Sequence, residues 1–380
     1  MHYSIKYLSY LLFIQLICTI DIFTQDSLDF SGVVFHTTST AGDYVAPEFL
    51  LPTLFDNIRV CQDVTNQRQV EVSIDVNPTD PDNIVAAWID YSFDDFAHVA
   101  YGYSFDGGQS WADGFLPTDV GDYIYQGDPA VAADKDGNFF ISFISFSSLS
   151  NGGIFVAKST DGGVNWPANA IVRLDGEPYN VFDDKPYIAI DKTDNETAGY
   201  IYVAWHYDWE INEIHFARST DHGSSFQRQR INEIDKMSQL GAMPALDENG
   251  IVYVVWLGQE LGPYSTHYRN FYLAKSTDGG ENFETETMII DSVERFTNLG
   301  IHLLNRLYPF PIIATNPVIS GHVYITWSNK VFGTGGFGEP DSSDVLFMHS
   351  TDYGETWSHP INIINSPYAQ NLPFKILNLE

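Results

Sequence analysis

The 380-residue sequence predicts an all-β protein in which one four-stranded sheet repeats along the chain. The first observation is a short segment of the form Ser-x-Asp-x-Gly-x-x-aromatic, which occurs five times. The second is the alternation of short apolar runs with turn residues around each copy, without an amphipathic helical stretch. Successive copies lie roughly 55 to 75 residues apart, near the upper range of propeller blades, so the pattern predicts a β-propeller.

The repeated segment has the chemistry of a β-hairpin turn. Its aspartate can accept hydrogen bonds from backbone N–H groups of the turn, and its glycine supplies a positive φ angle. The aromatic residue begins the returning strand and can bury its ring. Five copies cannot all be active sites, so we expect the aspartates to be structural: Asp106, Asp161, Asp221, Asp278 and Asp352.

The strand pattern predicts four strands per blade. In the first blade they begin near residues 71, 84, 98 and 111. Four second strands end in tryptophan, which we expect to pack between blades: Trp88, Trp205, Trp256 and Trp327. Five later first strands open with a residue followed by proline: Asp128-Pro129, Lys185-Pro186, Met243-Pro244, Phe310-Pro311 and Leu372-Pro373.

This pattern predicts a propeller over residues 70–380, with six or seven blades. The blades are expected at residues 70–120, 126–178, 183–234, 240–292 and 308–364, with the start of a sixth at 370–380. Two explanations of the incomplete last blade stay open at this point. The chain could lack its final strands, or the segment before the first blade could complete the last sheet.

The composition favours some partners and argues against others. The formal net charge of −32 disfavours nucleic-acid backbones and anionic membrane surfaces. Neutral glycans, cations or metal ions suit such a surface better. With 44% hydrophobic and 18% charged residues, the chain can bury a large core.

The N-terminus predicts export. Residues 1–25 combine a short basic region with an apolar run that is too short for a comfortable membrane span, which is typical of a signal peptide. We therefore expect a secreted or cell-surface protein, periplasmic or extracellular, without membrane insertion. Residues 26–69 read as a leader. Cys61 is then the one remaining cysteine, so no internal disulfide is expected.

Long loops at the end opposite the repeated turns carry the candidate chemistry. The densest group combines acid, base and a sugar platform: His206, Asp208, Trp209 and Glu210. A second group could bind or cleave uronates: Tyr264, His267 and Arg269. Arg306 and Tyr91 are further candidates for substrate binding. Two carboxylate pairs could hold Ca²⁺: Asp94 with Asp95, and Asp183 with Asp184. In the segment 134–138 a hairpin is favoured over a calcium loop.

The repeated segment resembles the Asp box of sialidase-like (BNR-repeat) β-propellers, and the resemblance runs from about Val70 to the C-terminus. It implies that each box joins the third and fourth strands of a blade, away from the substrate. In sialidases an arginine in a Phe/Tyr-Arg-Ile-Pro motif opens the first strand and binds the sugar carboxylate. Residues 70–73 read Val-Glu-Val-Ser here, so Glu71 stands in the arginine's place.

The resemblance therefore implies a secreted propeller that acts on extracellular glycans or polysaccharides but is not a standard sialidase. If it is an enzyme, it is a glycoside hydrolase, exo-sialidase-like in architecture, or a polysaccharide lyase. The alternative is a propeller that binds a glycan or a protein without turnover. No cofactor is required by either function, although Ca²⁺ could contribute.

Overall fold

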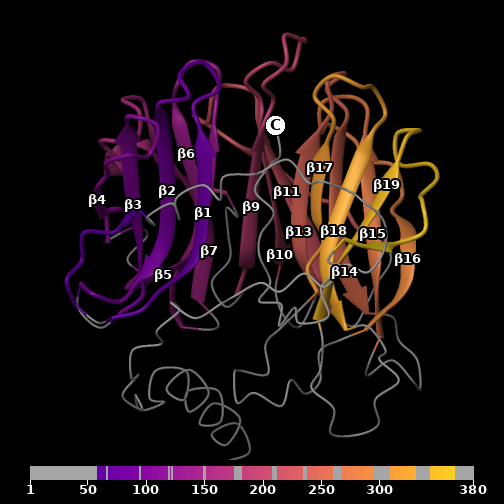
Figure 1. Cartoon of the computed structure of the whole chain (residues 1–380), viewed down its shortest axis with the longest axis horizontal. Helices are drawn as coiled ribbons and strands as arrows, with labels where there is room; N and C mark the ends of the chain where they lie inside the picture. The colour runs from indigo at the N-terminus through magenta and orange to yellow at the C-terminus, as the bar shows by residue number, and fades with distance from the viewer. Residues whose placement is uncertain are drawn as a thin grey trace, which may run out of the picture. The chain divides into compact units, whose positions relative to one another are not determined.

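The computed structural model describes most of the chain beyond residue 57 (Figure 1). The described residues are 58–65, 67–93, 96–118, 120, 123–148, 151–174, 182–207, 212–233, 238–259, 268–294, 309–330 and 343–363. They form five antiparallel sheets of four strands each, in the order first to fourth strand along the chain. The predicted all-β propeller of four-stranded blades is thus confirmed.

The strand bounds of the first three blades follow from runs of β-branched and aromatic residues between turns. Blade 1 contains β1 (Gln69–Val76), β2 (Asn83–Asp90), β3 (His98–Phe105) and β4 (Ala112–Phe115). Blade 2 contains β5 (Tyr125–Ala133), β6 (Phe139–Ser148), β7 (Asn151–Ser159) and β8 (Ile171–Arg173), with the 3₁₀ helix η2 (Ala168–Ala170) before β8. Blade 3 contains β9 (Asp184–Ile190), β10 (Ile201–Tyr207), β11 (Glu213–Ser219) and β12 (Gln227–Arg230).

The last two described blades have the same order. Blade 4 contains β13 (Ser238–Leu246), β14 (Val252–Gln259), β15 (Tyr268–Ser276) and β16 (Thr287–Glu294). Blade 5 contains β17 (Ile312–Thr315), β18 (Val323–Lys330), β19 (Ser343–Ser350) and β20 (Ile361–Asn362). The described residues thus hold five blades, where the sequence predicted six or seven. The expected sixth-blade segment, 370–380, lies outside them.

The hydrophobic core lies between blades. One buried cluster joins Val85 and Val99 of blade 1 to Phe139 and Phe143 of blade 2. The second-strand tryptophans are buried as expected, with Trp205 and Trp256 fully inaccessible and Trp88 and Trp327 at most 3% exposed. Middle strands therefore have apolar side chains on both faces, because a neighbouring blade can cover each face.

The repeated turns have the expected hydrogen bonds. In the first copy, Asp106 Oδ1 accepts from the Ser104 hydroxyl at 2.7 Å and from the Ser110 N–H at 2.8 Å. The Trp111 indole then donates to the Gly108 carbonyl at 2.9 Å and closes the turn. The other four aspartates each accept from the serine two residues earlier and from the backbone N–H four residues later: Asp161, Asp221, Asp278 and Asp352.

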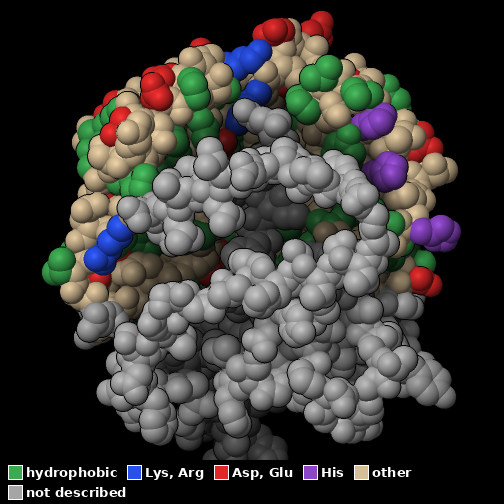
Figure 2. All heavy atoms as spheres, in the orientation of Figure 1, with side chains coloured by type: hydrophobic (Ala, Val, Ile, Leu, Met, Phe, Trp, Pro, Cys, Tyr) green, Lys and Arg blue, Asp and Glu red, His purple; other side chains and the backbone are tan. Residues whose placement is uncertain are grey.

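All five boxes lie at one end of the propeller. The hairpins that join first and second strands touch one another from blade to blade, as in the contacts of Thr79 with Lys135 and of Asn195 with Glu248. Because each blade is antiparallel, its Asp box lies at the same end as this hairpin. This is the upper end in Figure 1, and Figure 2 shows acidic side chains along the same rim.

The first strands of consecutive blades contact one another and so line the axis: β1 with β5, β5 with β9, β9 with β13, and β13 with β17. Ser73 and Asp75 of β1 accept the Val131 and Ala133 N–H groups of β5, which fixes the first two blades together. Among the described strands, no comparable contact between β17 and β1 closes the series. Within the described part of the chain, no helix is long and apolar enough to cross a membrane.

Candidate functional site

The first strands of blades 1 to 4 share a bulge beside the axis. The pairing with the second strand shifts between Val70 and Ser73 in β1, and at the matching places in β5, β9 and β13. The bulged residues take left-handed backbone conformations: Glu71 (φ 56°), Asp128 (φ 50°), Lys185 (φ 57°) and Gly241 (φ 66°). Three of these four are not glycine, although the conformation costs an L-residue about 1–2 kcal/mol. Strain of this kind concentrates at functional sites.

Strand pairing corrects one expected equivalence. The sequence aligned Met243-Pro244 with Lys185-Pro186, but Met243 pairs with Val255 just as Tyr187 pairs with Ala204. Gly241 is therefore the counterpart of Lys185. Equivalent positions in the first strands are therefore identified by their pairing with the second strand, and not by the nearby proline. In blade 5 the same count from the pair Ile312–Thr326 reaches Phe310.

The three charged bulge residues meet across the axis. The Lys185 ammonium group lies 2.7 Å from Glu71 Oε2 and 3.3 Å from Asp128 Oδ1. The Lys185 and Asp128 side chains are 24% and 12% exposed, while Glu71 is 41% exposed and reaches solvent. Residues from three blades, each 57 positions further along the chain than the last, thus form one cluster.

The cluster pushes its carboxyl pKa values in opposite directions. Partial loss of hydration at the axis, then the neighbouring charge of Asp128, raises the pKa of Glu71 to about 8 although part of its side chain is exposed. Burial opposes ionisation of Asp128 as well, but the Lys185 charge and hydrogen bonds with Glu71 and Asp184 lower its pKa below the usual range. Asp184, the first residue of β9, has a pKa raised by burial and by the Asp128 charge. At neutral pH the cluster therefore holds an ionised Asp128 beside a protonated Glu71.

Blades 4 and 5 place apolar residues at the same register position. A Cβ atom on Gly241 would lie 2.3 Å from Phe310 Cδ1, so the Phe310 ring lies directly against the Gly241 backbone. Charged groups from blades 1 to 3 thus share the axis with an aromatic ring from blade 5. A sugar presents polar edges and apolar faces, and an arrangement of this kind can contact both.

The cluster lies at the end away from the Asp boxes. Glu71 and Lys185 are near the beginnings of β1 and β9, whereas the Asp-box end lies beyond their last residues. The expectation that chemistry occurs at the opposite end is therefore compatible with this position. The Asp-box carboxylates are occupied by their own turns.

His206, which was a candidate acid or base, lies in β10 and is fully buried. Burial lowers its pKa to about 4, although a hydrogen bond with Asn212 opposes the shift. A buried neutral imidazole does not reach solvent, so a catalytic role for it stays a prediction without support from its position. Asp208, Trp209 and Glu210 lie outside the described residues.

The other predicted residues are placed in part. Tyr91 follows β2 at the same end as the cluster, with the Arg68 guanidinium 5.4 Å above its ring. Asp184 joins the cluster through its hydrogen bond with Asp128, while Asp183 is 1% exposed. Arg269 belongs to β15, but its side chain is outside the described part. Four other candidates lie entirely outside it: Asp94, Asp95, Tyr264 and His267. Arg306 is outside it too.

Asp128 and Lys185 were not predicted as site residues. The sequence did show both as residues before proline at strand openings, and it placed Glu71 where sialidases have their first arginine. Together these two signals mark one register position in three blades. Treating that position as a ring of side chains, and not as a strand boundary, would have found the cluster.

Comparisons with known proteins agree on the architecture. No family model matches the chain, and no curated protein does. An α-L-arabinofuranosidase from Fusarium graminearum, an E242A mutant solved with an iminosugar inhibitor, has 16% identity and a TM-score of 0.54 over 80% of this chain and 84% of its own. A leech intramolecular trans-sialidase has 13% identity and a TM-score of 0.54, over 81% of this chain and 62% of its own.

A third solved structure, the NanB sialidase of Streptococcus pneumoniae, has 9% identity and a TM-score of 0.51 over 77% of this chain and 61% of its own. At these identities the likeness shows the fold alone. The chain has the fold of the sialidase-like propellers, as the five Asp boxes predicted.

Proposed function

We propose that this protein is a secreted propeller that hydrolyses glycosidic bonds of an extracellular glycan, with Glu71 and Asp128 as its catalytic pair. The observation that carries the proposal is geometric: the Glu71 and Asp128 carboxyl groups, from two blades, both contact the Lys185 ammonium group, at 2.7 Å and 3.3 Å. Two carboxyl groups whose surroundings drive their pKa values apart supply the acid and the ionised partner that glycoside hydrolysis needs. The glycoside-active propellers among the structural neighbours support the same class of substrate.

In this mechanism Glu71 protonates the leaving oxygen, because its carboxyl group keeps a proton at neutral pH and is exposed. Asp128 acts from the other side as nucleophile or as base for water, and Lys185 keeps it ionised. A sugar entering between the two groups would replace their hydrogen bond. It would set the carboxyl groups roughly 5 to 9.5 Å apart, the range that glycosidases use.

The charge of the cluster favours a neutral sugar over a sialic acid or uronate. Among the described cluster residues Lys185 is the cation, and the Glu71 and Asp128 carboxyl groups already contact it. A sugar carboxylate would need further cations at the axis, as clusters of arginines provide in acid-sugar sites. This agrees with the glutamate at position 71, where a sialidase would have arginine.

A binding propeller without turnover is the second candidate. It is favoured by the direct contacts of Lys185 with the Glu71 and Asp128 carboxyl groups, which keep the three side chains engaged as they would be in a recognition site. Further parts of the proposal concern the rest of the chain. They are export by residues 1–25, a sixth blade that begins near residue 370, and Ca²⁺ binding by a carboxylate pair, Asp94 with Asp95 or Asp183 with Asp184.

The experiment compares turnover with binding on the same set of glycans. The protein is assayed against neutral arabino- and hexo-glycans, sialosides and uronate polysaccharides, and it is screened on a glycan array. Turnover of a neutral glycan that Glu71→Gln abolishes supports the hydrolase. Binding without turnover, lost in Lys185→Met, supports the second candidate. Equal behaviour of wild type and both variants would refute a role for the cluster.

A further inference from the structure

His222 occupies a position in the third Asp box where three of the other four copies have glycine. It follows Asp221 in the box, and the matching residues are Gly107, Gly162 and Gly279, with Tyr353 in blade 5. All five take a left-handed backbone, and His222 has φ 56°. Its ring lies against Gly199, where an added Cβ atom would be 3.1 Å from Cε1 and 3.2 Å from Nδ1. A β-carbon at position 199 would crowd the imidazole, so the glycine leaves it room.

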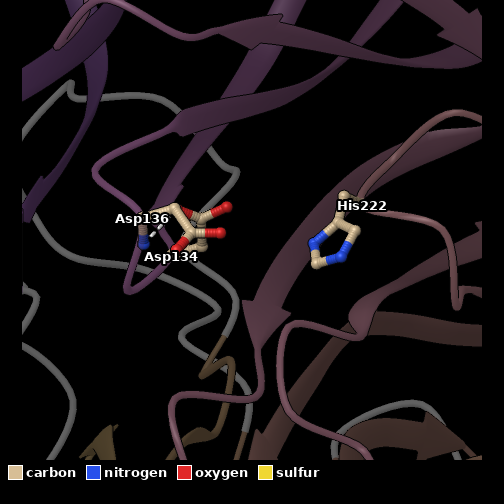
Figure 3. Close-up of side chains that lie close together, drawn as sticks. All are labelled: Asp134, Asp136 and His222. Atoms are coloured by element: carbon tan, nitrogen blue, oxygen red, sulfur yellow. Dashed lines mark hydrogen bonds between the residues drawn. The ribbon is translucent and has the colours of Figure 1, made fainter.

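The ring faces two carboxylates of the preceding blade (Figure 3). Asp134 and Asp136 belong to the hairpin between β5 and β6, which the sequence predicted as a turn. One ligand atom from each of Asp134, Asp136 and His222 lies within 4.8 Å of the other two. Asp134 is buried, while Asp136 and His222 are exposed and can turn towards a shared ligand.

The hairpin holds Asp134 in place for such a role. Asp134 Oδ1 accepts the N–H groups of Asp136 and Asn138, both at 2.9 Å. Oδ2 accepts from the Asn138 amide at 2.8 Å and keeps a second lone pair. Hydrogen bonds of this kind orient metal-binding carboxylates in proteins.

We propose that Asp134, Asp136 and His222 bind a divalent transition-metal ion, with Zn²⁺ as the best match, between blades 2 and 3. One imidazole nitrogen with two carboxylate oxygens is a ligand set that suits Zn²⁺, and water completes a tetrahedral shell. Ca²⁺ prefers six to eight oxygen ligands, so the histidine argues against it. The nearby lysines have other partners, since Lys135 pairs with Asp194 and Lys158 donates to the His222 carbonyl.

The ion would connect two blades at the Asp-box end, where no substrate chemistry is proposed. Asp134 and Asp136 come from the first hairpin of blade 2, and His222 from the box of blade 3. Their coordination would add a link between two blades that the contacts of Lys135 with Asp194 and of Lys158 with His222 already join at this end. The site is independent of the proposed glycan site at the opposite end.

The chain supplies a matched pair of variants for the test. His222→Gly removes the imidazole and restores the glycine that three other boxes contain, so the fold is kept. Tyr353→Gly makes the same change of backbone preference in blade 5, where φ is 62°, without touching the site. Asp136→Asn removes one exposed carboxylate charge.

Zn²⁺ binding to the full chain without a histidine tag is measured by titration calorimetry, with Ca²⁺ as the comparison ion. We expect one Zn²⁺ per chain in the wild type and in Tyr353→Gly, and an affinity at least about tenfold lower in His222→Gly and Asp136→Asn. Zn²⁺ should also raise the thermal midpoint of the wild type but not of His222→Gly. Unchanged affinity in His222→Gly, or no saturable Zn²⁺ binding by the wild type, would overturn the proposal.

Discussion

The two ends of the propeller repeat in different ways. At one end, five Asp boxes carry nearly the same residues and the same hydrogen bonds. At the other, a bulge with a left-handed residue recurs in the first strands of blades 1 to 4, yet its residue changes in every blade: Glu71, Asp128, Lys185 and Gly241. The box is a local unit that each blade needs. The bulge is a shared backbone position whose side chains meet only when the blades surround the axis.

A repeat protein of this kind can use different positions for stabilising its blades and for the proposed action on a substrate. Uniform residues at a repeated position stabilise each blade by itself. Different residues at a repeated position make the surroundings of the axis asymmetric. Blades 1 to 3 contribute charged side chains there, and blades 4 and 5 contribute apolar residues. Changes at the two ends should accordingly separate activity from stability.

The largest expected effect is on turnover. Glu71→Gln keeps the shape of the side chain but removes the proton donor, so kcat/KM should fall about 10²- to 10⁴-fold. The free energy of unfolding at neutral pH should not fall, because glutamine avoids the cost of protonating Glu71 on folding. Lys192→Met is the control, since it breaks the 3.0 Å ion pair with Asp75 that also joins blades 1 and 3, but at the other end. Equal losses of turnover in the two variants would contradict the assignment.

The next largest effect distinguishes bulge positions from one another. Gly241→Ala places a Cβ atom 2.3 Å from the Phe310 ring on a backbone with φ 66°. We expect a loss of about 2–3 kcal/mol of unfolding free energy, from overpacking and from the left-handed conformation. Urea denaturation of the variant and wild type measures the loss. An unchanged free energy of unfolding in Gly241→Ala would mean that this position is not tightly packed.

A smaller loss is expected at the Asp-box end. Asp278→Ala removes the acceptor of the Ser276 hydroxyl and of the Asn282 N–H and amide groups. Unfolding free energy should fall by about 1–2 kcal/mol, since the turn is exposed and water replaces part of these bonds. Turnover at a temperature well below the unfolding transition should match the wild type. A drop in kcat/KM without a drop in stability would break the contrast between the two ends.

The fourth prediction concerns the pH dependence of stability. Hydrogen bonds from the turn lower the pKa of Asp106 and of Asp352 to about 2. For Asp278 burial opposes the shift, but hydrogen bonds still lower the pKa to about 2. Their stabilisation is present above the unfolded pKa of about 4 and is lost as the pH falls through 2. Glu71 has the opposite sign. Its raised pKa gives stability below the unfolded value of about 4.3 that is lost as the pH rises through about 8.

Denaturation curves of wild type and Glu71→Gln between pH 3 and pH 9 measure this difference. The variant should lose less stability than the wild type on the alkaline side, and the two curves should have the same shape on the acid side. A wild-type basic limb of kcat/KM near pH 8 should accompany it. Parallel curves throughout would show that Glu71 does not titrate in this range.

The sequence predicted the blades and the Asp boxes because both depend on local chemistry. A serine, an aspartate and a glycine within a few residues specify their turn without help from the rest of the chain. The tryptophans of the second strands were also predicted as buried. Side chains of a middle strand point alternately to the two faces of the sheet, and a neighbouring blade covers each face.

The charged cluster could not be predicted in the same way. Glu71 and Lys185 are 114 residues apart, and only the arrangement of three blades brings them within 2.7 Å. Candidate chemistry was expected where different residue types are dense in the sequence, as around His206. That reasoning omits burial, and His206 lies in a middle strand covered on both faces. The register of Gly241 likewise depends on its pairing with β14 and not on the nearby proline.

The ion pairs between blades 1 and 3 should affect how the propeller unfolds. In most repeat proteins each unit touches only its neighbours, so stability is close to a sum of units and adjacent interfaces. Lys185 with Glu71, and Lys192 with Asp75, instead connect blade 3 to blade 1 past the blade between them. The first three blades should therefore lose their structure together in one step, and a nearest-neighbour description of this propeller should fail in its N-terminal half.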